Sequence, residues 1–207
     1  MEENRIAELR GAGNPPAPSF EGSLLLHTCC APCSVACIDS LREEGIEPVS
    51  YWFNPNIHPF TEYRMRRNTL REYTASIGVK LLENDVYGLR AYLDAVGGNY
   101  EQKDRCPVCY HIRLDEAARF AGENGFSAFS TTLLISPYQN HELLIAAGEA
   151  AEKKYGVEFL YRDFRPLFRQ GQDRARELGL YMQKYCGCIF SEEERYQKRK
   201  KKHKEEA

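Results

Sequence analysis

Residues 23–33 read Ser-Leu-Leu-Leu-His-Thr-Cys-Cys-Ala-Pro-Cys, and this stretch decides the fold. The apolar run at its start predicts a short buried strand. Pro32 suits the first turn of a helix, and apolar residues then recur at helical spacing until Gly45. The sequence therefore predicts a strand that turns directly into a helix, with three cysteines at the turn.

Apolar strands and helices alternate along the rest of the chain. We expect further strands at 48–53, 79–82, 126–133 and 157–161, and further helices at 61–77, 88–96, 108–123, 141–155 and 173–182. The stretch 99–106 is expected to be a loop that carries the second cysteine pair, and the end of the chain from 191 is expected to be helical. This alternation predicts an α/β fold, a Rossmann-like parallel sheet with helices on both faces.

Length and charge limit the function classes. The chain has 207 residues, 43% of them hydrophobic, which suits one domain with a real core. Its net charge of −2 argues against an electrostatic grip on nucleic acid by the whole chain, but not against a local basic patch. No run approaches the ~18 apolar residues of a spanning helix, and no signal-peptide pattern is present. We expect a cytoplasmic protein without a membrane partner.

Composition divides the chain into three parts. Residues 1–20 are rich in Gly and Pro and are expected to be a mobile leader. Residues 21–193 are expected to form a single α/β domain that binds metal and carries the catalysis. Residues 194–207 form a basic charged tail, which is either a solubilising end or a clamp on a nucleic-acid backbone.

Eight cysteines in a chain of this kind are unusual, and they fall into three clusters. The clusters are Cys29, Cys30, Cys33 and Cys37; Cys106 and Cys109; and Cys186 and Cys188. Without an export signal, such clusters indicate metal or redox chemistry more than disulfides. Cys37 follows Cys33 by one helical turn, and we expect it to pack in the core.

Three distant clusters can meet at one edge of a parallel sheet. Ligands bind beyond the carboxyl ends of such strands, and the first cluster follows a strand directly. Thiolates select iron–sulfur clusters, zinc or copper(I). A four-iron cluster takes four thiolates, which leaves three of the seven in the motifs for a second role. Structural zinc, disulfides and simple packing remain the alternatives at this point.

Four motifs together resemble those of the cobalamin-independent epoxyqueuosine reductases. They are His27 to Cys33, Cys106-Pro107-Val108-Cys109-Tyr110, Thr131-Thr132-Leu133 with Ser136-Pro137-Tyr138, and Tyr185-Cys186-Gly187-Cys188. The resemblance covers residues 23–193. It implies a fold similar to the nucleotide alpha-hydrolase/PP-loop group. It also implies the last step of queuosine biosynthesis, in which epoxyqueuosine in tRNA is deoxygenated to queuosine.

The same resemblance implies the metal content and the ligands. It implies a [4Fe-4S] cluster beside one additional iron ion. Cys30, Cys106, Cys109 and Cys188 correspond to the cluster ligands. Cys29, Cys33 and Cys186 correspond to the ligands of the second metal.

Removal of an epoxide oxygen needs two electrons, two protons and a way to break C–O bonds. Our hypothesis is that a metal with an open position binds the oxygen as a Lewis acid while the cluster passes electrons from an external electron donor. The catalytic candidates are therefore Cys29, Cys33, Cys186, His27 and Tyr110. His58 is a further candidate proton donor, and a structural role is the alternative for His27.

The substrate would lie in the anticodon loop of a tRNA, which is single-stranded and is recognised by stacking and phosphate contacts. Polar and aromatic residues near predicted strand ends are the candidate contacts. They are Asn54, Asn56, Tyr63, Arg66, Thr131, Thr132, Ser136, Tyr138, Arg165 and Gln172.

Two other functions stay open. One is a zinc-binding, non-enzymatic module that binds tRNA or protein. The other is a different iron–sulfur enzyme of tRNA modification, such as a sulfur-transfer enzyme of the PP-loop type. The second needs a phosphate loop after the first strand, where this chain has Cys-Cys-Ala-Pro-Cys instead. No Gly-x-Gly-x-x-Gly or Walker pattern supports a flavin, NAD or ATP site.

Overall fold

The computed structural model describes residues 22–205, with side chains up to Gln197, so the predicted leader at 1–20 lies outside the described residues. Within that part of the chain, five strands form one sheet in the order β3-β2-β1-β4-β5. The strands are β1 (Leu24–His27), β2 (Pro48–Trp52), β3 (Leu81–Glu83), β4 (Ala128–Thr131) and β5 (Glu158–Phe159). All neighbouring strands are parallel, which confirms the predicted α/β fold.

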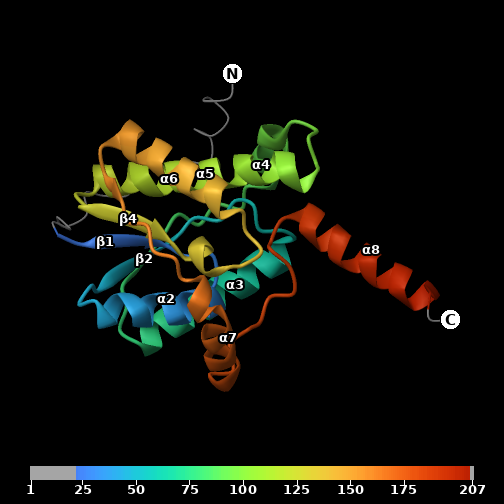
Figure 1. The fold of residues 1–207 in the computed structure, drawn as a ribbon, viewed down its shortest axis with the longest axis horizontal. Helices are drawn as coiled ribbons and strands as arrows, with labels where there is room; N and C mark the ends of the chain where they lie inside the picture. The colour runs from blue at the N-terminus through green and yellow to red at the C-terminus, as the bar shows by residue number, and fades with distance from the viewer. Residues whose placement is uncertain (1–21, 206–207) are drawn as a thin grey trace.

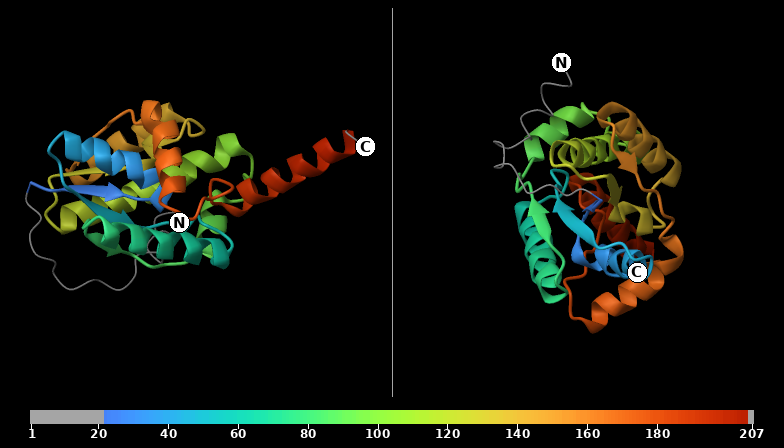
Figure 2. Two further views of the ribbon diagram at one scale, coloured as in Figure 1. Left: turned by 90° about the horizontal axis from the view of Figure 1, so that it is seen from below. Right: turned by 90° about the vertical axis from the view of Figure 1, so that its left-hand side faces the viewer.

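Helices cover both faces of this sheet, as predicted. They are α2 (Ala31–Glu43), α3 (Phe60–Ser76), α4 (Leu89–Val96), α5 (Gln102–Glu123), α6 (His141–Tyr155), α7 (Phe168–Glu177) and α8 (Ile189–Glu205). Two short 3-10 helices lie at Thr132–Ile135 and Arg165–Leu167. Helices α5 and α6 lie on one face and α2 and α3 on the other, while α7 packs against α2 (Figure 1). Helix α8 extends away from the body of the molecule (Figures 1 and 2).

Strand β1 lies at the centre of the sheet because its residues are apolar on both sides. Its three leucines are at most 3% exposed. Leu25 pairs with Val49 of β2 and Phe129 of β4. A strand covered by helices on both faces is expected to have such a continuous apolar run.

The chain order reverses between β1 and β4. It runs outward from β1 to β2 and β3, and then returns to place β4 on the other side of β1. His27, Tyr51 and Thr131 lie side by side in register near the carboxyl ends of these strands. The segments that follow the three strands therefore meet at a topological switch point, where ligands of such sheets bind.

Several element boundaries differ from those that the sequence predicts, most of all in two helices. The predicted loop at 99–106 is wrong in its second half, because helix α5 begins at Gln102 and includes Pro107. The predicted helix begins only at Val108. The extra turn puts Cys106 and Cys109 three residues apart on one helix, and therefore on the same face. The helix predicted at 173–182 is found at 168–177. The strand predicted at 126–133 ends at Thr131, where a 3-10 helix follows.

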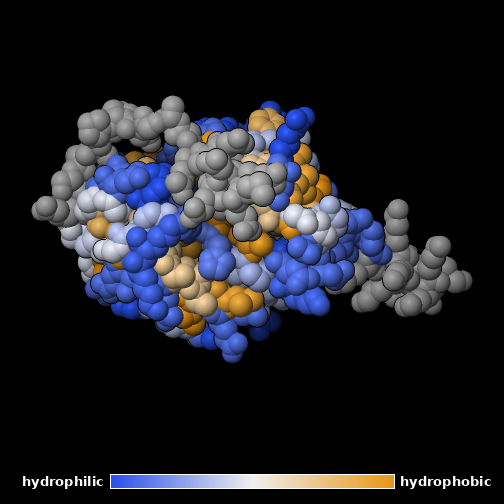
Figure 3. Space-filling model, turned by 90° about the horizontal axis from the view of Figure 1, so that it is seen from above, coloured by the Kyte–Doolittle hydropathy of each residue, from blue (hydrophilic) through white to orange (hydrophobic). Residues whose placement is uncertain are grey.

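The surface on the side covered by α5 and α6 is mixed in character. Where it is not hidden by the residues drawn in grey, small hydrophobic patches alternate with hydrophilic ones (Figure 3). None of the helices in the described part of the chain has the length and apolar character needed to span a membrane.

Candidate metal centre

Cys29, Cys30 and Cys33 form a compact group at the turn from β1 to α2. Cys30 is the residue before the helix and has an extended backbone, while Cys33 lies in the first turn. The Sγ atoms of Cys29 and Cys30 are 3.7 Å apart, and all three sulfurs lie within 4.8 Å of one another. All three residues are buried. Three clustered thiols beside the free N–H groups of a helix start make a good site for a thiophilic metal.

The other four cysteines of the motifs come from two further segments. Helix α5 presents Cys106 and Cys109, and the segment before α8 carries Cys186 and Cys188. Burial is the main cause that raises the pKa of the Cys109 thiol to about 12; Arg113 lowers this pKa, while Cys186, Cys188 and Cys106 add to the rise.

The Cys186–Cys188 segment is held in place by backbone contacts. Arg66 donates hydrogen bonds to the carbonyls of Tyr185 and Cys186, each at 2.9 Å. The N–H of His58 donates to the carbonyl of Gly187 at 2.8 Å. Gly187 has a φ of +141°, and a Cβ atom there would lie 3.2 Å from Arg66 Nη1. The third motif therefore needs glycine between its two cysteines.

Hydrogen-bond donors face the sulfur atoms. The contacts to Sγ are Thr132 Oγ1 to Cys29 at 3.5 Å, Gln183 Nε2 to Cys30 at 3.0 Å and to Cys33 at 3.4 Å, Gln139 Nε2 to Cys186 at 3.4 Å, the Ser191 N–H to Cys188 at 3.4 Å, and Arg113 Nη1 to Cys109 at 3.8 Å. Thiolates that bind metal accept such bonds, which orient them and tune the metal. The donor set therefore fits thiolate-bound iron or zinc.

One thiol of the compact group is already favoured as a thiolate. Hydrogen bonding from Cys30, together with that from Cys33, lowers the pKa of Cys29 well below its usual value. Burial raises the pKa of Cys30. One anion shared among three sulfurs is a suitable starting point for metal uptake, because a metal binds the thiolate and releases protons from the remaining thiols.

His27 has a structural role in this geometry rather than that of a proton donor. Its side chain is fully buried, Nδ1 lies 2.8 Å from Thr131 Oγ1, and Nε2 lies 3.1 Å from the Phe53 carbonyl. Burial lowers the pKa of His27 to about 3, so the ring is neutral at pH 7. Both nitrogens are thus used to connect the ends of β1, β2 and β4.

Tyr110 and His58 are close to the cysteines but differ in their contacts. The Tyr110 hydroxyl donates to Gln139 Oε1 at 2.8 Å and accepts from the Asn140 N–H at 3.2 Å. Tyr110 therefore holds Gln139, which in turn contacts Cys186. His58 is fully buried, and its ring lies against Tyr87 and Tyr92. Burial lowers the pKa of His58 to about 4.

Several predicted substrate contacts are internal. Asn54 is buried, with Nδ2 donating to the Thr28 carbonyl at 3.0 Å. Thr131 and Thr132 are also buried, and Asn56 is 1% exposed. Tyr63 is 1% exposed and its hydroxyl donates to Asp85 at 2.8 Å. These side chains build the edge of the site, and their burial leaves no free face for a base.

Arg66 is buried as well, at 2% exposed. The other four predicted contacts, Ser136, Tyr138, Arg165 and Gln172, are at least partly exposed. Tyr138 is 76% exposed on the loop after β4, two residues beyond Ser136. Arg165 is exposed and paired with Asp163 at 2.6 Å, and Gln172 is half-buried on α7. Of these four residues, Tyr138 is the one that directly precedes a cysteine contact, because the next residue in the sequence, Gln139, contacts Cys186.

Three residues of the site were not predicted from the sequence: Gln139, Gln183 and Arg113. Gln183 and Cys30 are 153 positions apart, so no local pattern could have joined them. Arg113 had a usable signal, because it follows Cys109 by four residues on one helix and so lies on the same face. Cys37 is fully buried in α2, as its predicted packing role requires.

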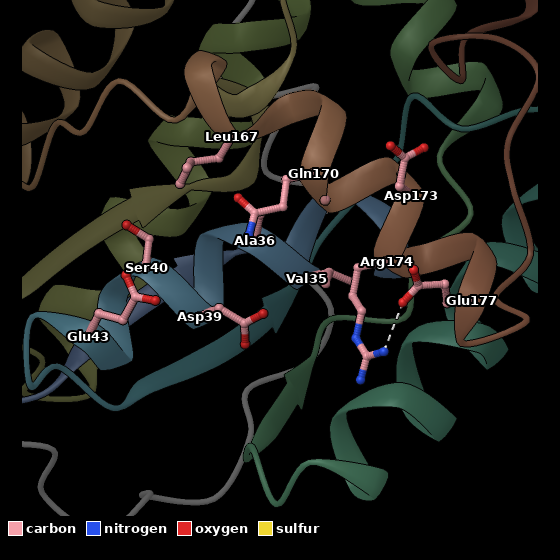
Figure 4. A pocket seen from close by; sticks show the side chains of 11 residues that line it. Val35, Ala36, Asp39, Ser40, Glu43, Leu167, Gln170, Asp173, Arg174 and Glu177 are labelled. Carbon is pink, nitrogen blue, oxygen red and sulfur yellow. Dashed lines mark hydrogen bonds and ion pairs between the residues drawn. The ribbon is translucent and has the colours of Figure 1, made fainter.

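A pocket of about 470 Å³ between α2 and α7 is separate from this centre. Asp39 and Glu43 of α2 and Asp173 and Glu177 of α7 line it (Figure 4). None of these residues is a predicted ligand, and their carboxylates would repel the phosphates of a nucleic acid.

Comparison with known proteins connects this arrangement to one family. The family model described as epoxyqueuosine reductase QueH matches residues 24–194. The chain belongs to the QueH family. An epoxyqueuosine reductase QueH of Dehalococcoides mccartyi is 38% identical over 175 residues, which cover 84% of this chain and 95% of the relative. The QueH of Thermotoga maritima is 35% identical over 184 residues, covering 86% of this chain and 94% of the relative.

The QueH match contains all seven cysteines of the three motifs and ends within α8. Among solved structures, a predicted subunit of a tRNA methyltransferase from Methanocaldococcus jannaschii aligns with a TM-score of 0.47 and 13% identity. That alignment covers 76% of this chain and 89% of the other. The similarity to the PP-loop group thus stays an expectation, while the parallel sheet itself is observed.

Proposed function

We propose that this chain is an epoxyqueuosine reductase, an oxidoreductase that converts epoxyqueuosine in tRNA to queuosine. The observation that carries the proposal is the buried group of three thiols within 4.8 Å, at the switch point of a QueH-family chain. The reaction consumes two electrons and two protons, and the epoxide oxygen leaves as water. The electrons come from an external donor. Eight free cysteines suit the reducing cytoplasm as the location.

We propose that cysteine-bound iron, rather than cobalamin, serves this reaction. Cys30, Cys106, Cys109 and Cys188 would hold a [4Fe-4S] cluster, and Cys29, Cys33 and Cys186 one further iron ion. Bound iron of these two kinds supplies electron transfer and a Lewis acid. The support is the number of thiols, since a four-iron cluster uses four and leaves three. The 3.7 Å between the sulfurs of Cys29 and Cys30 suits ligands of adjacent metals.

The chain's own residues orient the thiolates. Gln183 donates to both Cys30 and Cys33, which fixes the two sulfurs relative to each other. Tyr110 fixes the amide of Gln139 so that its N–H points to Cys186. Tyr110 is therefore a positioning residue. Its hydroxyl proton is already donated within the protein, which leaves protonation of the product to water or to the substrate's own groups.

The loop after β4 is the proposed contact with the anticodon loop. Tyr138 is 76% exposed there, and its ring meets Phe168 edge-on with the centroids 5.9 Å apart. An exposed, supported aromatic ring beside the metal centre suits stacking with an unpaired base. The basic tail at 194–207 is proposed to contact the tRNA backbone. Its helix α8 is fixed to the body through Arg105 and Glu194, 2.8 Å apart.

Replacement of Tyr138 by alanine is expected to weaken tRNA binding roughly 5- to 150-fold, since a base–aromatic stack contributes about 1–3 kcal/mol. Binding is measured by fluorescence anisotropy with an anticodon stem-loop that contains epoxyqueuosine. Tyr138→Phe should bind like the wild type because it keeps the ring. Tyr161→Ala removes an exposed tyrosine outside the predicted site and is the matched control. Wild-type affinity in Tyr138→Ala would remove this residue from the interface.

The function itself is tested with protein prepared and loaded with iron without oxygen. It is incubated with dithionite, a viologen mediator and tRNA that contains epoxyqueuosine, and the nucleosides are analysed by mass spectrometry. We expect the modified base to lose one oxygen atom. A colourless protein with stoichiometric zinc and no turnover would favour the alternative of a zinc-binding, non-enzymatic module that binds tRNA or protein. A product that gains sulfur would favour the sulfur-transfer enzyme.

A further inference from the structure

Arg113 on α5 is a buried cation with an unusual set of partners. Its side chain is 2% exposed. Nη2 donates to Asn54 Oδ1 at 2.8 Å, and Nη1 donates to Cys109 Sγ at 3.8 Å. Across the described part of the chain, no carboxylate lies within ion-pair distance of it, and its Nε–H has no partner. A buried charge of this kind is costly unless an opposite charge compensates it.

Two other buried arginines near the cysteines are compensated by carboxylates. Arg66 contacts Glu62 at 2.7 Å, and Arg105 contacts Glu194 at 2.8 Å. Both arginines are 2% exposed, so burial alone does not distinguish them from Arg113. The three arginines differ in the group that compensates the positive charge. For Arg66 and Arg105 this group is a carboxylate, and for Arg113 it has to be another kind of anion.

Cysteines are the neighbours of Arg113 that can become anionic, as thiolates bound to metal. Cys109 is in contact with it. Burial lowers the pKa of the Arg113 guanidinium, whereas Cys109, Cys29 and Cys186 raise it. These three cysteines come from the three separate motifs of the chain. Arg113 thus contacts one of the cysteine motifs directly and lies near enough to the other two for their charge to affect it.

We propose that Arg113 is the fixed counter-charge of the metal centre and raises the reduction potential of the iron–sulfur cluster held there. This inference rests on the proposed function. One-electron reduction of a cluster adds a negative charge, which a fixed cation in a water-poor site stabilises. Net charge and hydrogen bonds to the sulfurs are among the factors that set cluster potentials. Arg113 supplies both, and Asn54 holds its guanidinium in place.

The test is a midpoint potential measured by anaerobic titration with dithionite and mediators, followed by EPR. Arg113→Met removes the charge and the hydrogen bond but keeps much of the volume. We expect its reduction equilibrium constant to fall at least tenfold, which is about 59 mV for one electron. Arg113→Lys keeps the charge and should stay close to wild type. Arg174→Met removes an exposed arginine paired with Glu177 and should not change the potential.

Each outcome decides the proposal. Arg113→Met that carries a full cluster at the wild-type potential would overturn it, and so would Arg113→Lys with a strongly lowered potential. If Arg113→Met does not take up iron while Arg113→Lys does so at the wild-type potential, the need for the charge is supported. If neither variant takes up iron, the shape of the guanidinium matters rather than its charge, and the proposal is wrong. A wild type without a cluster signal would instead contradict the proposed function.

Discussion

Cys106→Ser and Cys109→Ser are each expected to lose the broad visible absorbance of the anaerobically prepared protein and all epoxide reduction. The wild type should hold about four to five irons per chain. Both thiols lie on one face of α5, and a hydroxyl is a poor ligand for cluster iron. Iron analysis and the visible spectrum measure the loss, and circular dichroism verifies that the fold is kept.

Cys37→Ala is the matched control for these two variants. Cys37 lies on α2 in the core and belongs to no proposed ligand set. Its variant should keep full iron content and turnover, with at most a modest loss of stability from the smaller side chain. A complete cluster spectrum in either Cys106→Ser or Cys109→Ser would show that the α5 pair does not ligate the cluster.

The second large effect should separate two adjacent residues. Cys30→Ser is expected to destroy the four-iron cluster. Cys29→Ser is expected to keep most of its absorbance but to lose about one iron and all turnover. The two sulfurs lie 3.7 Å apart at the turn into α2, so each thiol can serve one of two adjacent metals. Iron content and Mössbauer spectra of the two variants, recorded side by side, measure the difference.

The short distance between the Cys29 and Cys30 sulfurs also allows the opposite result, in which both thiols bind the same metal. Two thiolates 3.7 Å apart also suit a single ion, with metal–sulfur bonds of about 2.3 Å. Identical loss of the cluster signal in both variants would place Cys29 and Cys30 on the same metal group. Full turnover in Cys29→Ser would remove the catalytic need for the second iron. Cys188→Ser should behave like Cys30→Ser, and Cys186→Ser like Cys29→Ser.

The sequence contained enough information for the architecture. The run Leu24–Leu26, followed at once by the cysteines and Pro32, is a local pattern, and it predicts the central strand, the turn and the helix in the order found. The position of Cys29, Cys30 and Cys33 at the carboxyl end of β1 followed from a general property of parallel sheets, and the convergence of all three clusters stays a prediction. The start of α5 is predicted too late, because the stretch 99–106 is taken as a loop whereas the helix already begins at Gln102.

The contacts within the site could not be predicted because they join distant positions. His27 and Thr131 are 104 positions apart, and their hydrogen bond turns a candidate acid into a structural residue. The amide of Gln139 reaches Cys186 across 47 positions. Only the packed fold determines which polar group faces which sulfur, since one-residue shifts in a loop change every partner.

The division of the seven thiols among three segments has a consequence for how the protein is made. A ribosome releases the chain from its amino end, and domains fold in that direction. The first three thiols emerge long before Gln183 and the last motif, which complete their surroundings. A nascent chain therefore offers an open thiol group that any thiophilic ion in the cell can enter. On the proposed ligand assignment, the metal centre would be complete only when translation is nearly finished, and iron would then be delivered after translation.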